Sequence, residues 1–387
     1  MKFLVKFFKW FIIVLTSIIL LMYIFNVDYL LRAVKTIYFK GYTTAFLEDY
    51  KEFPNREIKK GIAQPWAIAT DYNTIPATET LQKTHKELQT IAYLIIKNDS
   101  IWHESYFDGF DKNAKTNSFS MAKSIVTMAM GKAIMEGKIK SLDQKVIDFF
   151  PELKGQFAKE VTVGDLSSMA SGLSWDEKYY SPFSIVTRAY FDDNLKEIIL
   201  GLEINEKPGQ SFKYLSGATQ LLAMCIEKAT GEHLSDYVSK HFWQPMGAEN
   251  EALWQLDEAP DGIEKAYCCI ASNARDFARF GKLYLNNGKW NDKEILDSAF
   301  VKKCITPRFE KSPEYGYGWW MHNFLGKDLY YMRGHLGQFV IVIPEDKLII
   351  VRLGHLKGIQ TTYDPHSEDL YVYVEEAYNM LEKKKKK

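Results

Sequence analysis

The chain of 387 residues is 47% apolar and 25% charged, which is typical of a globular protein with a large core and excludes a collagen-like, low-complexity or wholly disordered chain. Its 49 basic residues equal its 49 acidic ones, but eight lysines lie at the two ends, at positions 2, 6, 9 and 383–387. The body between them carries 41 basic against 49 acidic residues. Because a nucleic-acid binder needs a basic face, we expect no nucleic-acid partner.

An uncharged run rich in Ile, Leu and Phe, residues 10–27, follows the three N-terminal lysines. Its length of 18 residues is just enough to cross a bilayer as a helix. A cleavable signal peptide has a shorter apolar core followed by small residues, which are missing here. Since basic residues stay in the cytoplasm, residues 1–27 predict a single-pass, uncleaved signal anchor with the body on the extracytoplasmic (periplasmic) side. A cleaved signal is the alternative.

Residues 28–84 are interpreted as a membrane-proximal connector and lead-in, without clear periodicity up to about residue 60. Within this segment, residues 78–90 suit a surface helix. Two apolar stretches around a polar turn, at 92–96 and 101–107, then predict a hairpin.

A helix is expected from after Asn117 to Met135, because Gly137 provides a stop signal, and a mainly helical stretch continues to about residue 300. Four apolar segments with short polar turns then predict strands at residues 317–321, 329–332, 339–343 and 348–353. A last helix is expected at 367–383, before a solvated lysine tail at 383–387, for which contact with anionic lipid is the alternative.

Strands near both ends of the body with helices between them predict an α+β fold. We expect an antiparallel sheet built from distant segments and flanked by N- and C-terminal helices, with a mainly helical region inserted at about 124–300. The predicted domain covers residues 85–382.

The first chemical signal is Ser120 with Lys123 at the start of a helix. Residues three apart on a helix lie on one face, so the lysine is near the serine hydroxyl. A serine becomes a nucleophile when a base takes its proton, and a lysine serves as that base if its surroundings lower its pKa. The helix N-terminus adds positive potential where an oxyanion develops. Alone, the pattern also fits a helix cap and a surface lysine.

Two further signals follow in the chain. Tyr214 and Ser216 lie in a loop before a helix, where a tyrosine next to a lysine can relay a proton, although Tyr214 alone also fits a packing role. His335 and Gly337 precede a strand, where a glycine admits a substrate to the strand edge and the N–H of Gln338 can donate to an oxyanion. Alone, His335 also fits an ordinary turn.

In this order and spacing the three signals resemble the serine β-lactamase and penicillin-binding-protein superfamily, whose elements are S-x-x-K, Y-x-N or S-x-N, and K-T-G or H-x-G. The resemblance covers residues 85–382 and is class C-like in the stretches 136–143, 150–153 and 161–172. Within the superfamily the chain is most similar to the 6-aminohexanoate-dimer (nylon-oligomer) hydrolase group, on residues 120–124, 274–281, 315–320 and 333–338.

The resemblance implies a serine hydrolase without cofactor or metal. Ser120 is then the acylated nucleophile, Lys123 its base and Tyr214 the group that moves a proton to the leaving group and activates the deacylating water. The N–H groups of Ser120 and Gln338 form the oxyanion hole. Nylon-oligomer hydrolases use a second tyrosine that hydrogen-bonds the substrate amide, a role open to Tyr179 or Tyr180, with Tyr179 preferred.

Two departures bear on the substrate. Ser216 replaces the common Asn, and His335 replaces a Lys that would be a permanent cation for a β-lactam carboxylate. Both favour hydrolysis of a small-molecule carboxylic ester or linear amide, with Ser216, His335 and Gly337 as substrate-binding residues. The alternatives are a D-amino-acid peptidase or weak β-lactamase, and a non-catalytic sensor of cell-wall fragments.

Cysteines and histidines offer no competing chemistry in the sequence. No spacing typical of a zinc site occurs among the four cysteines or the eight histidines. Cys268 and Cys269 are adjacent, and we expect strain to keep them from pairing with each other. The aromatic clusters around Trp243, Trp254 and Trp319 fit either an acyl pocket or core packing.

Overall fold

The computed structural model describes residues 1–361 and 363–385. Its largest element is a seven-stranded sheet in the order β10-β11-β12-β13-β3-β4-β2, in which only β2 and β4 pair parallel. The sheet therefore joins strands from distant parts of the chain, as predicted. The strands are β2 (Ala67–Ile68), β3 (Thr90–Lys97), β4 (Ser100–Tyr106), β10 (Trp320–Phe324), β11 (Lys327–Gly334), β12 (Gln338–Ile343) and β13 (Leu348–Gly354).

Both faces of this sheet are covered by helices. Successive side chains of a strand point to opposite faces, so Leu94 of β3 belongs to the core beneath α10 (Ala274–Leu285), while Tyr93 belongs to the core beneath α3 (Glu79–Glu87) and α12 (Glu368–Lys385). The predicted hairpin is β3–β4, and the predicted surface helix is α3, which Thr78 caps by accepting from the N–H of Leu81.

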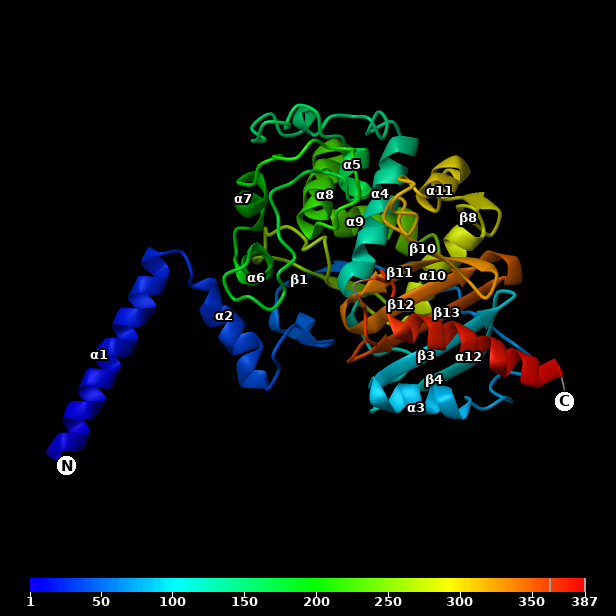
Figure 1. Cartoon of the computed structure of the whole chain (residues 1–387), viewed down its shortest axis with the longest axis horizontal. Helices are drawn as coiled ribbons and strands as arrows, with labels where there is room; N and C mark the ends of the chain where they lie inside the picture. The colour runs from blue at the N-terminus through cyan, green and yellow to red at the C-terminus, as the bar shows by residue number, and fades with distance from the viewer. Residues whose placement is uncertain (362, 386–387) are drawn as a thin grey trace.

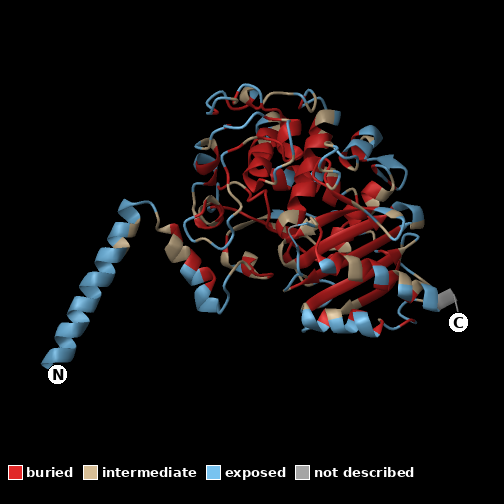
Figure 2. Ribbon diagram, viewed as in Figure 1, coloured by how far each residue is buried: buried red, intermediate tan, exposed pale blue. Residues whose placement is uncertain are grey.

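The helical region lies beyond one end of the sheet and is built around α4 and α8, which pack together (Figure 1). These two helices are mostly buried, as Figure 2 shows. The helix predicted after Asn117 is α4, and the left-handed Gly137 follows its end. The helices of the region are α4 (Ala122–Met135), α5 (Val163–Ser167), α6 (Ile185–Phe191), α7 (Leu195–Leu200), α8 (Ser216–Thr230), α9 (Leu234–Val238) and α11 (Ser298–Cys304).

The predicted helical stretch also contains strands. A second sheet in the order β1-β6-β7-β5 joins the helical region to the N-terminal segment. Its strands are β1 (Asn55–Ile58), β5 (Thr116–Asn117), β6 (Ala252–Gln255) and β7 (Ile270–Ser272), and a small hairpin is formed by β8 (Lys289–Trp290) and β9 (Lys293–Glu294).

The N-terminal helix α1 (Lys2–Ile24) projects from the body with none of its residues buried (Figure 1). Within the described residues it is the one helix long and apolar enough to cross a membrane, a property that a signal sequence shares. The following segment, predicted as a membrane-proximal connector without clear periodicity, contains a short helix. Helix α2 (Tyr29–Thr36) packs on α6 and buries Tyr29 and Ala33. This helix was missed in the sequence because its apolar stripe is too short to show a helical period.

Two boundaries differ from the prediction. Strand β10 begins at Trp320, because the backbone N–H groups of Tyr317 and Gly318 donate to the helical region instead, to the carbonyls of Cys304 and Ser167. Helix α12 continues through Lys385, so the predicted tail is helical at its start. The last two lysines of that predicted tail, residues 386–387, lie outside the described residues.

Candidate active site

Ser120 lies on a 3-10 turn, Phe119–Met121, that leads directly into α4. The residue before it, Phe119, has a positive φ of 46°, a backbone conformation that is costly for a bulky residue and is found mainly where the surroundings enforce it. Here the side-chain oxygen of Asn117 accepts from the N–H of Phe119 at 2.8 Å, and the hydroxyl of Ser118 donates to the Phe119 carbonyl at 3.1 Å. The turn that presents Ser120 is thus fixed from behind.

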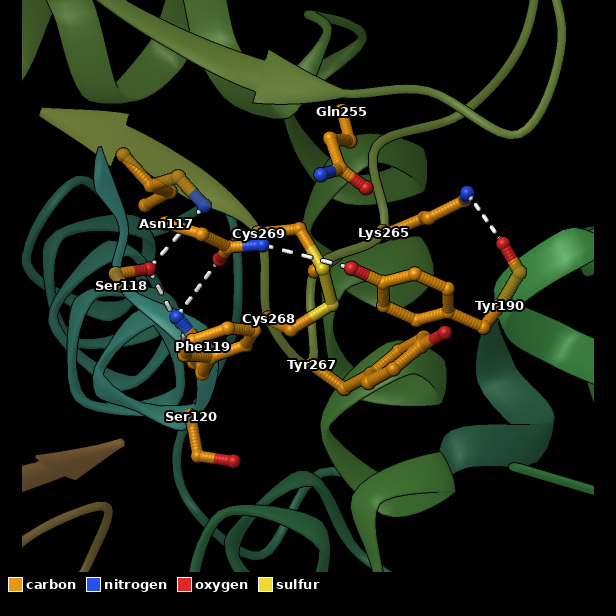
Figure 3. Close-up of a disulfide and its surroundings, with 12 residues drawn as sticks. Asn117, Ser118, Phe119, Ser120, Tyr190, Gln255, Lys265, Tyr267, Cys268 and Cys269 are labelled. Atoms are coloured by element: carbon orange, nitrogen blue, oxygen red, sulfur yellow. Dashed lines mark hydrogen bonds between the residues drawn. A yellow bond between two sulfur atoms is a disulfide. The ribbon is translucent and has the colours of Figure 1, made fainter. Parts of the chain in front are cut away.

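A buried polar cluster holds Asn117 in turn. Its amide donates to Asp49 at 2.9 Å, and Asp49 also accepts from the hydroxyl of Tyr190 at 2.6 Å and from the amide of Gln255 at 3.0 Å. Burial raises the pKa of Asp49 to about 6 against the opposing effect of these donors. The Lys265 ammonium, which donates to the Tyr190 carbonyl at 2.6 Å (Figure 3), has its pKa lowered to about 7 by burial. This cluster was not predicted from the sequence, because its members come from four distant segments.

The side chain of Lys123 is buried behind Ser120, with 3% of the residue exposed. Its Nζ lies 3.0 Å from Oγ of Ser120 and donates to the backbone carbonyl of Tyr267 at 2.7 Å. The same Nζ lies 5.1 Å from the centre of the Tyr214 ring. The structure therefore brings together the serine, lysine and tyrosine that the sequence singled out.

The carbonyl that accepts from Lys123 is followed directly by a disulfide between Cys268 and Cys269 (Figure 3). The expectation that these neighbours do not pair was wrong. In an extended backbone, successive side chains point to opposite sides, which would separate the two sulfur atoms. Cys269 instead has a positive φ of 80°, so its backbone is not extended. The Cys269 carbonyl accepts from the N–H of Gln255 at 3.1 Å, so hydrogen bonding also holds this turn.

Glu177 is a site residue that the sequence did not single out. Its carboxylate accepts from the hydroxyl of Tyr179, from the backbone N–H of Ser216 and, at 3.1 Å, from the hydroxyl of Ser216. The hydroxyl oxygens of Tyr179 and Ser216 lie 3.5 Å from each other. Glu177 thus ties the loop after residue 172 to the start of α8. A signal for it was absent because acidic residues in polar loops are common.

The two candidate tyrosines of this loop differ in their surroundings. The ring of Tyr179 stacks on the imidazole of His335, with ring centres 6.0 Å apart and planes 11° apart. Although 41% of Tyr179 is exposed, desolvation of its hydroxyl, assisted by the negative charge of Glu177, raises its pKa above the usual value. Tyr180 is 77% exposed. Tyr179 is therefore the tyrosine of the pair that meets the other candidate site residues.

His335 lies between Tyr179 and Phe119, whose ring meets it edge-on at 5.6 Å. Burial lowers the pKa of His335 to about 4, assisted by the positive charge of Lys357, so the imidazole is neutral at pH 7. This agrees with the expectation that His335 is no permanent cation.

Gly337 and Gln338 begin the neighbouring strand. Gly337 has a φ of 77°, a backbone conformation that favours glycine. An added Cβ would lie 2.6 Å from the Arg352 guanidinium, so a larger residue would also clash with Arg352. The side chain of Gln338 is buried and bonds the carbonyls of His335 and Gly354 at 3.0 and 2.7 Å. It thereby fixes the start of β12, whose neighbour β11 packs against the turn that carries Ser120.

Two cavities meet at Ser120 and Tyr179. The apolar cavity, of about 310 Å³, is bounded by α2, the 179–191 segment, Tyr267 and Cys268, and also by Ser216 and His335. The polar cavity, of about 180 Å³, includes Tyr214, His335, Gly337 and the cations Arg333 and Lys357. Gln338 itself borders neither cavity, although its neighbours Gly337 and Phe339 border the polar one.

One group of side chains elsewhere has the composition of a metal site. Oxygen and nitrogen atoms of Glu227, His233 and Glu264 lie within 4.8 Å of one another. Glu264 already pairs with Arg56 at 2.8 Å, and none of the three borders the cavities at Ser120. This group is therefore separate from the candidate active site.

A sheet flanked by terminal helices, with a helical region that delivers Ser120 and Lys123 to the sheet edge, defines the fold class of β-lactamases and penicillin-binding proteins. The family model described as Beta-lactamase matches residues 77–364, about three quarters of the chain. The protein belongs to this family, which confirms the resemblance found in the sequence, and it has the β-lactamase fold of a family of hydrolases.

Relatives within the family agree with the finer resemblance. The 6-aminohexanoate-dimer hydrolase of Paenarthrobacter ureafaciens is 25% identical over 236 residues, which are 58% of this chain and 59% of that protein. Protein flp of Staphylococcus aureus is 25% identical over 188 residues, 46% of this chain and 37% of that protein. The matches thus span less than two thirds of these relatives.

Among solved structures, a provisionally named 6-aminohexanoate-dimer hydrolase from Bacillus anthracis superposes with a TM-score of 0.70 at 22% identity. The superposition covers 87% of this chain and 92% of that one. At this identity the likeness establishes the fold.

Proposed function

We propose that this protein is a serine hydrolase that cleaves carboxylic esters or linear amides through an acyl-enzyme at Ser120. The observation that carries the proposal is the 3.0 Å separation between Oγ of Ser120 and the buried Nζ of Lys123. This is hydrogen-bond distance, which a general base needs in order to take the proton of the attacking hydroxyl.

In the first half of the reaction, Ser120 attacks the substrate carbonyl as its proton passes to Lys123. The negative charge that develops on the carbonyl oxygen is stabilised by the backbone N–H groups of Ser120 and Gln338. Tyr214, whose ring lies beside the Lys123 ammonium, passes a proton to the leaving group. The carbonyl–heteroatom bond then breaks, and the acyl group stays on Ser120.

In the second half, the Tyr214 phenolate takes a proton from the water that attacks the acyl-enzyme. The bond between the acyl group and Oγ of Ser120 breaks, and Lys123 returns its proton to Oγ.

For an amide substrate, the hydroxyl oxygen of Tyr179 accepts from the substrate N–H, while its own proton is donated to Glu177 and its ring stacks on His335. At His335 a β-lactam carboxylate meets a neutral imidazole in place of a permanent cation, which favours an ester or linear amide as substrate. Arg333 and Lys357 in the same cavity are the reason that nitrocefin is included in the test.

We also propose that α1 is retained as a single-pass anchor and that the body lies on the extracytoplasmic side. Three lysines precede an apolar helix none of whose residues is buried against the body. This combination favours a helix that resides in lipid with its basic end in the cytoplasm.

The test is to treat the full chain with a fluorophosphonate probe and to follow adduct formation by intact mass, beside Ser120→Ala and Lys123→Ala. In parallel, turnover of p-nitrophenyl butyrate and nitrocefin is measured. We expect labelling and ester turnover in the wild type, neither in Ser120→Ala, and a loss of at least about 100-fold in Lys123→Ala, the usual scale for removal of a general base.

The comparison variant is Lys132→Ala, on the same helix but outside both cavities, which should label and turn over normally. A folded wild type that neither labels nor turns over ester would overturn the proposal. Rapid turnover of nitrocefin with none of the ester would redirect it to β-lactam substrates.

A further inference from the structure

The apolar cavity at Ser120 extends away from the sheet to the helix that follows the N-terminal anchor. At one end it is bounded by Phe119 and Tyr267, and at the other by Ala33 and Ile37 of α2. No charged side chain borders it, since His335 is held neutral by burial. Its volume of about 310 Å³ is at the lower end of the range for small-molecule sites.

The opposite side of Ser120 is chemically different. There the polar cavity includes Arg333 and Lys357, for which the described part of the chain shows no ion pair with a carboxylate. A substrate with one apolar end and one polar end therefore has a single favourable orientation across Ser120. The apolar end lies toward α2.

The rim of the apolar cavity is unusually apolar for a surface in water. Five of its large apolar side chains are widely exposed, with exposed fractions of 39% for Val34, 59% for Tyr38, 41% for Tyr179, 77% for Tyr180 and 74% for Phe183. An exposed apolar group of this kind around a cavity marks a binding site or a contact with lipid. Aromatic side chains are enriched at membrane interfaces, where their rings meet both phases.

The chain itself places this rim near a bilayer. Helix α1 ends at Ile24 and α2 begins at Tyr29, so four residues separate them. The backbone from Ile24 to Tyr29 therefore covers five residue steps and spans at most about 18 Å. With α1 in the membrane, the start of α2 lies within that distance of the lipid surface, and α2 forms one wall of the cavity.

We propose that the apolar cavity binds the hydrocarbon chain of a membrane amphiphile and presents its ester or amide carbonyl to Ser120. The inference rests on the proposed function and names its substrate class. The chain leaves the bilayer past Val34, Tyr38, Tyr180 and Phe183 and lies between α2 and the 179–191 segment. The scissile carbonyl meets Ser120, and the polar end of the substrate faces Arg333 and Lys357.

The first experiment uses the full chain in phosphatidylcholine nanodiscs with p-nitrophenyl butyrate, octanoate and dodecanoate. Burial of each methylene contributes about 0.8 kcal/mol, so kcat/KM should rise by up to about fourfold per added methylene until the cavity is full. In Val34→Asp, which places a carboxylate at the cavity, the ratio of dodecanoate to butyrate kcat/KM should fall by at least about tenfold.

The matched control is Lys35→Asp, which places the same carboxylate on the next residue of α2, outside the apolar cavity. Partition of the esters into the nanodisc is the same for all variants, so it cancels when their ratios are compared. Lys35→Asp should keep the wild-type ratio. An equal fall in both variants would overturn the inference, because the effect would then come from charge near the membrane and not from the cavity.

A second experiment separates binding from turnover. Ser120→Ala keeps the cavity and removes the nucleophile, so binding of pyrene-labelled dodecanoate to it is followed by fluorescence. We expect saturable binding that Val34→Asp weakens by at least about tenfold and Lys35→Asp leaves unchanged. Wild-type protein that labels at Ser120 but shows no preference for longer chains would overturn this inference and leave the proposed function intact. Loss of labelling would overturn both.

Discussion

The backbone carbonyl of Tyr267 accepts a hydrogen bond from Lys123 at 2.7 Å, so the position of the proposed base depends on the turn that carries Tyr267. The Cys268–Cys269 disulfide forms the next two residues of that turn. The disulfide closes a small covalent ring through the backbone of these two adjacent residues and so restricts their backbone freedom. It therefore restricts the carbonyl just before it, and the chemistry at Ser120 is linked to the oxidation state of two cysteines.

Reduction of this disulfide should slow the enzyme. Treatment with a phosphine reductant is expected to lower kcat for p-nitrophenyl butyrate by about fivefold, because small displacements of a catalytic group are costly. A Cys268→Ala, Cys269→Ala double variant should show the lower rate with and without reductant. Intact mass reports whether the bond is reduced. A fully reduced wild type with unchanged kcat would refute the link.

Glu177 is expected to position Tyr179 and the start of α8. In Glu177→Gln, an amide NH₂ group replaces one of the two acceptor oxygens of the carboxylate. This NH₂ group is a donor and cannot accept from the N–H or the hydroxyl of Ser216. The value of kcat/KM should fall by about tenfold, equivalent to ~1.4 kcal/mol of transition-state stabilisation. If Glu177 positions Tyr179, Tyr179→Phe in the Glu177→Gln background should add little to the loss. Steady-state kinetics of the two single variants and the double variant test this.

The control for this series is Glu203→Gln, an exposed glutamate that borders neither cavity. It should retain wild-type kcat/KM. Strictly additive losses in the Glu177 and Tyr179 double variant would show that the two side chains act separately.

Asn117 should matter for both stability and rate. Asn117→Ala removes the acceptor that holds Phe119 at its positive φ and leaves Asp49 short of one donor. Loss of these buried hydrogen bonds should lower the free energy of unfolding by about 2 kcal/mol, and kcat should fall as the turn at Ser120 loosens. Denaturation by urea and turnover of p-nitrophenyl butyrate measure the two effects.

The exposed Asn113 provides the matched change, since Asn113→Ala lies on the same segment and should alter neither quantity. A destabilised Asn117→Ala protein with full kcat would show that the positive φ of Phe119 serves folding alone.

Local patterns in the sequence were sufficient for the β3–β4 hairpin and for α4, which carries Lys123 and begins just after Ser120. The β3–β4 hairpin and α4 follow from alternation of apolar residues and from a clear stop signal, which are properties of neighbouring residues. The order of the three motifs then gave the family. The hairpin and α4 depend mainly on interactions between residues that are near one another in the chain, which is why the sequence predicts them.

The parts that the sequence did not predict depend on contacts between distant segments. Asp49 and Asn117 meet across 68 positions, and Glu177 and Ser216 across 39. The brief apolar face of α2 becomes recognisable when it packs on α6. The pairing of Cys268 with Cys269 was not expected because strain was thought to prevent it, and the positive φ of Cys269 cannot be deduced from the two residues alone. No single-sequence pattern contains this information.

His85 should make the fold sensitive to acid. It is 4% exposed and packs among the rings of Tyr93, Phe107 and Tyr373, and within the described chain neither ring nitrogen has a hydrogen-bond partner. Burial, together with the charge of Arg352, lowers the pKa of His85 to about 3.

The unfolded chain, with a histidine pKa of about 6.5, binds a proton at His85 at a pH where the native state does not. The contribution of a neutral His85 to stability is therefore present above pH 6.5 and is lost progressively as the pH falls toward 3. In His85→Phe this loss is absent, so the free energy of unfolding should fall less between pH 7 and pH 4, by about 3 kcal/mol. Urea denaturation of both proteins across this range measures the difference. Parallel curves would mean that His85 is protonated as readily in the native state as in the unfolded chain.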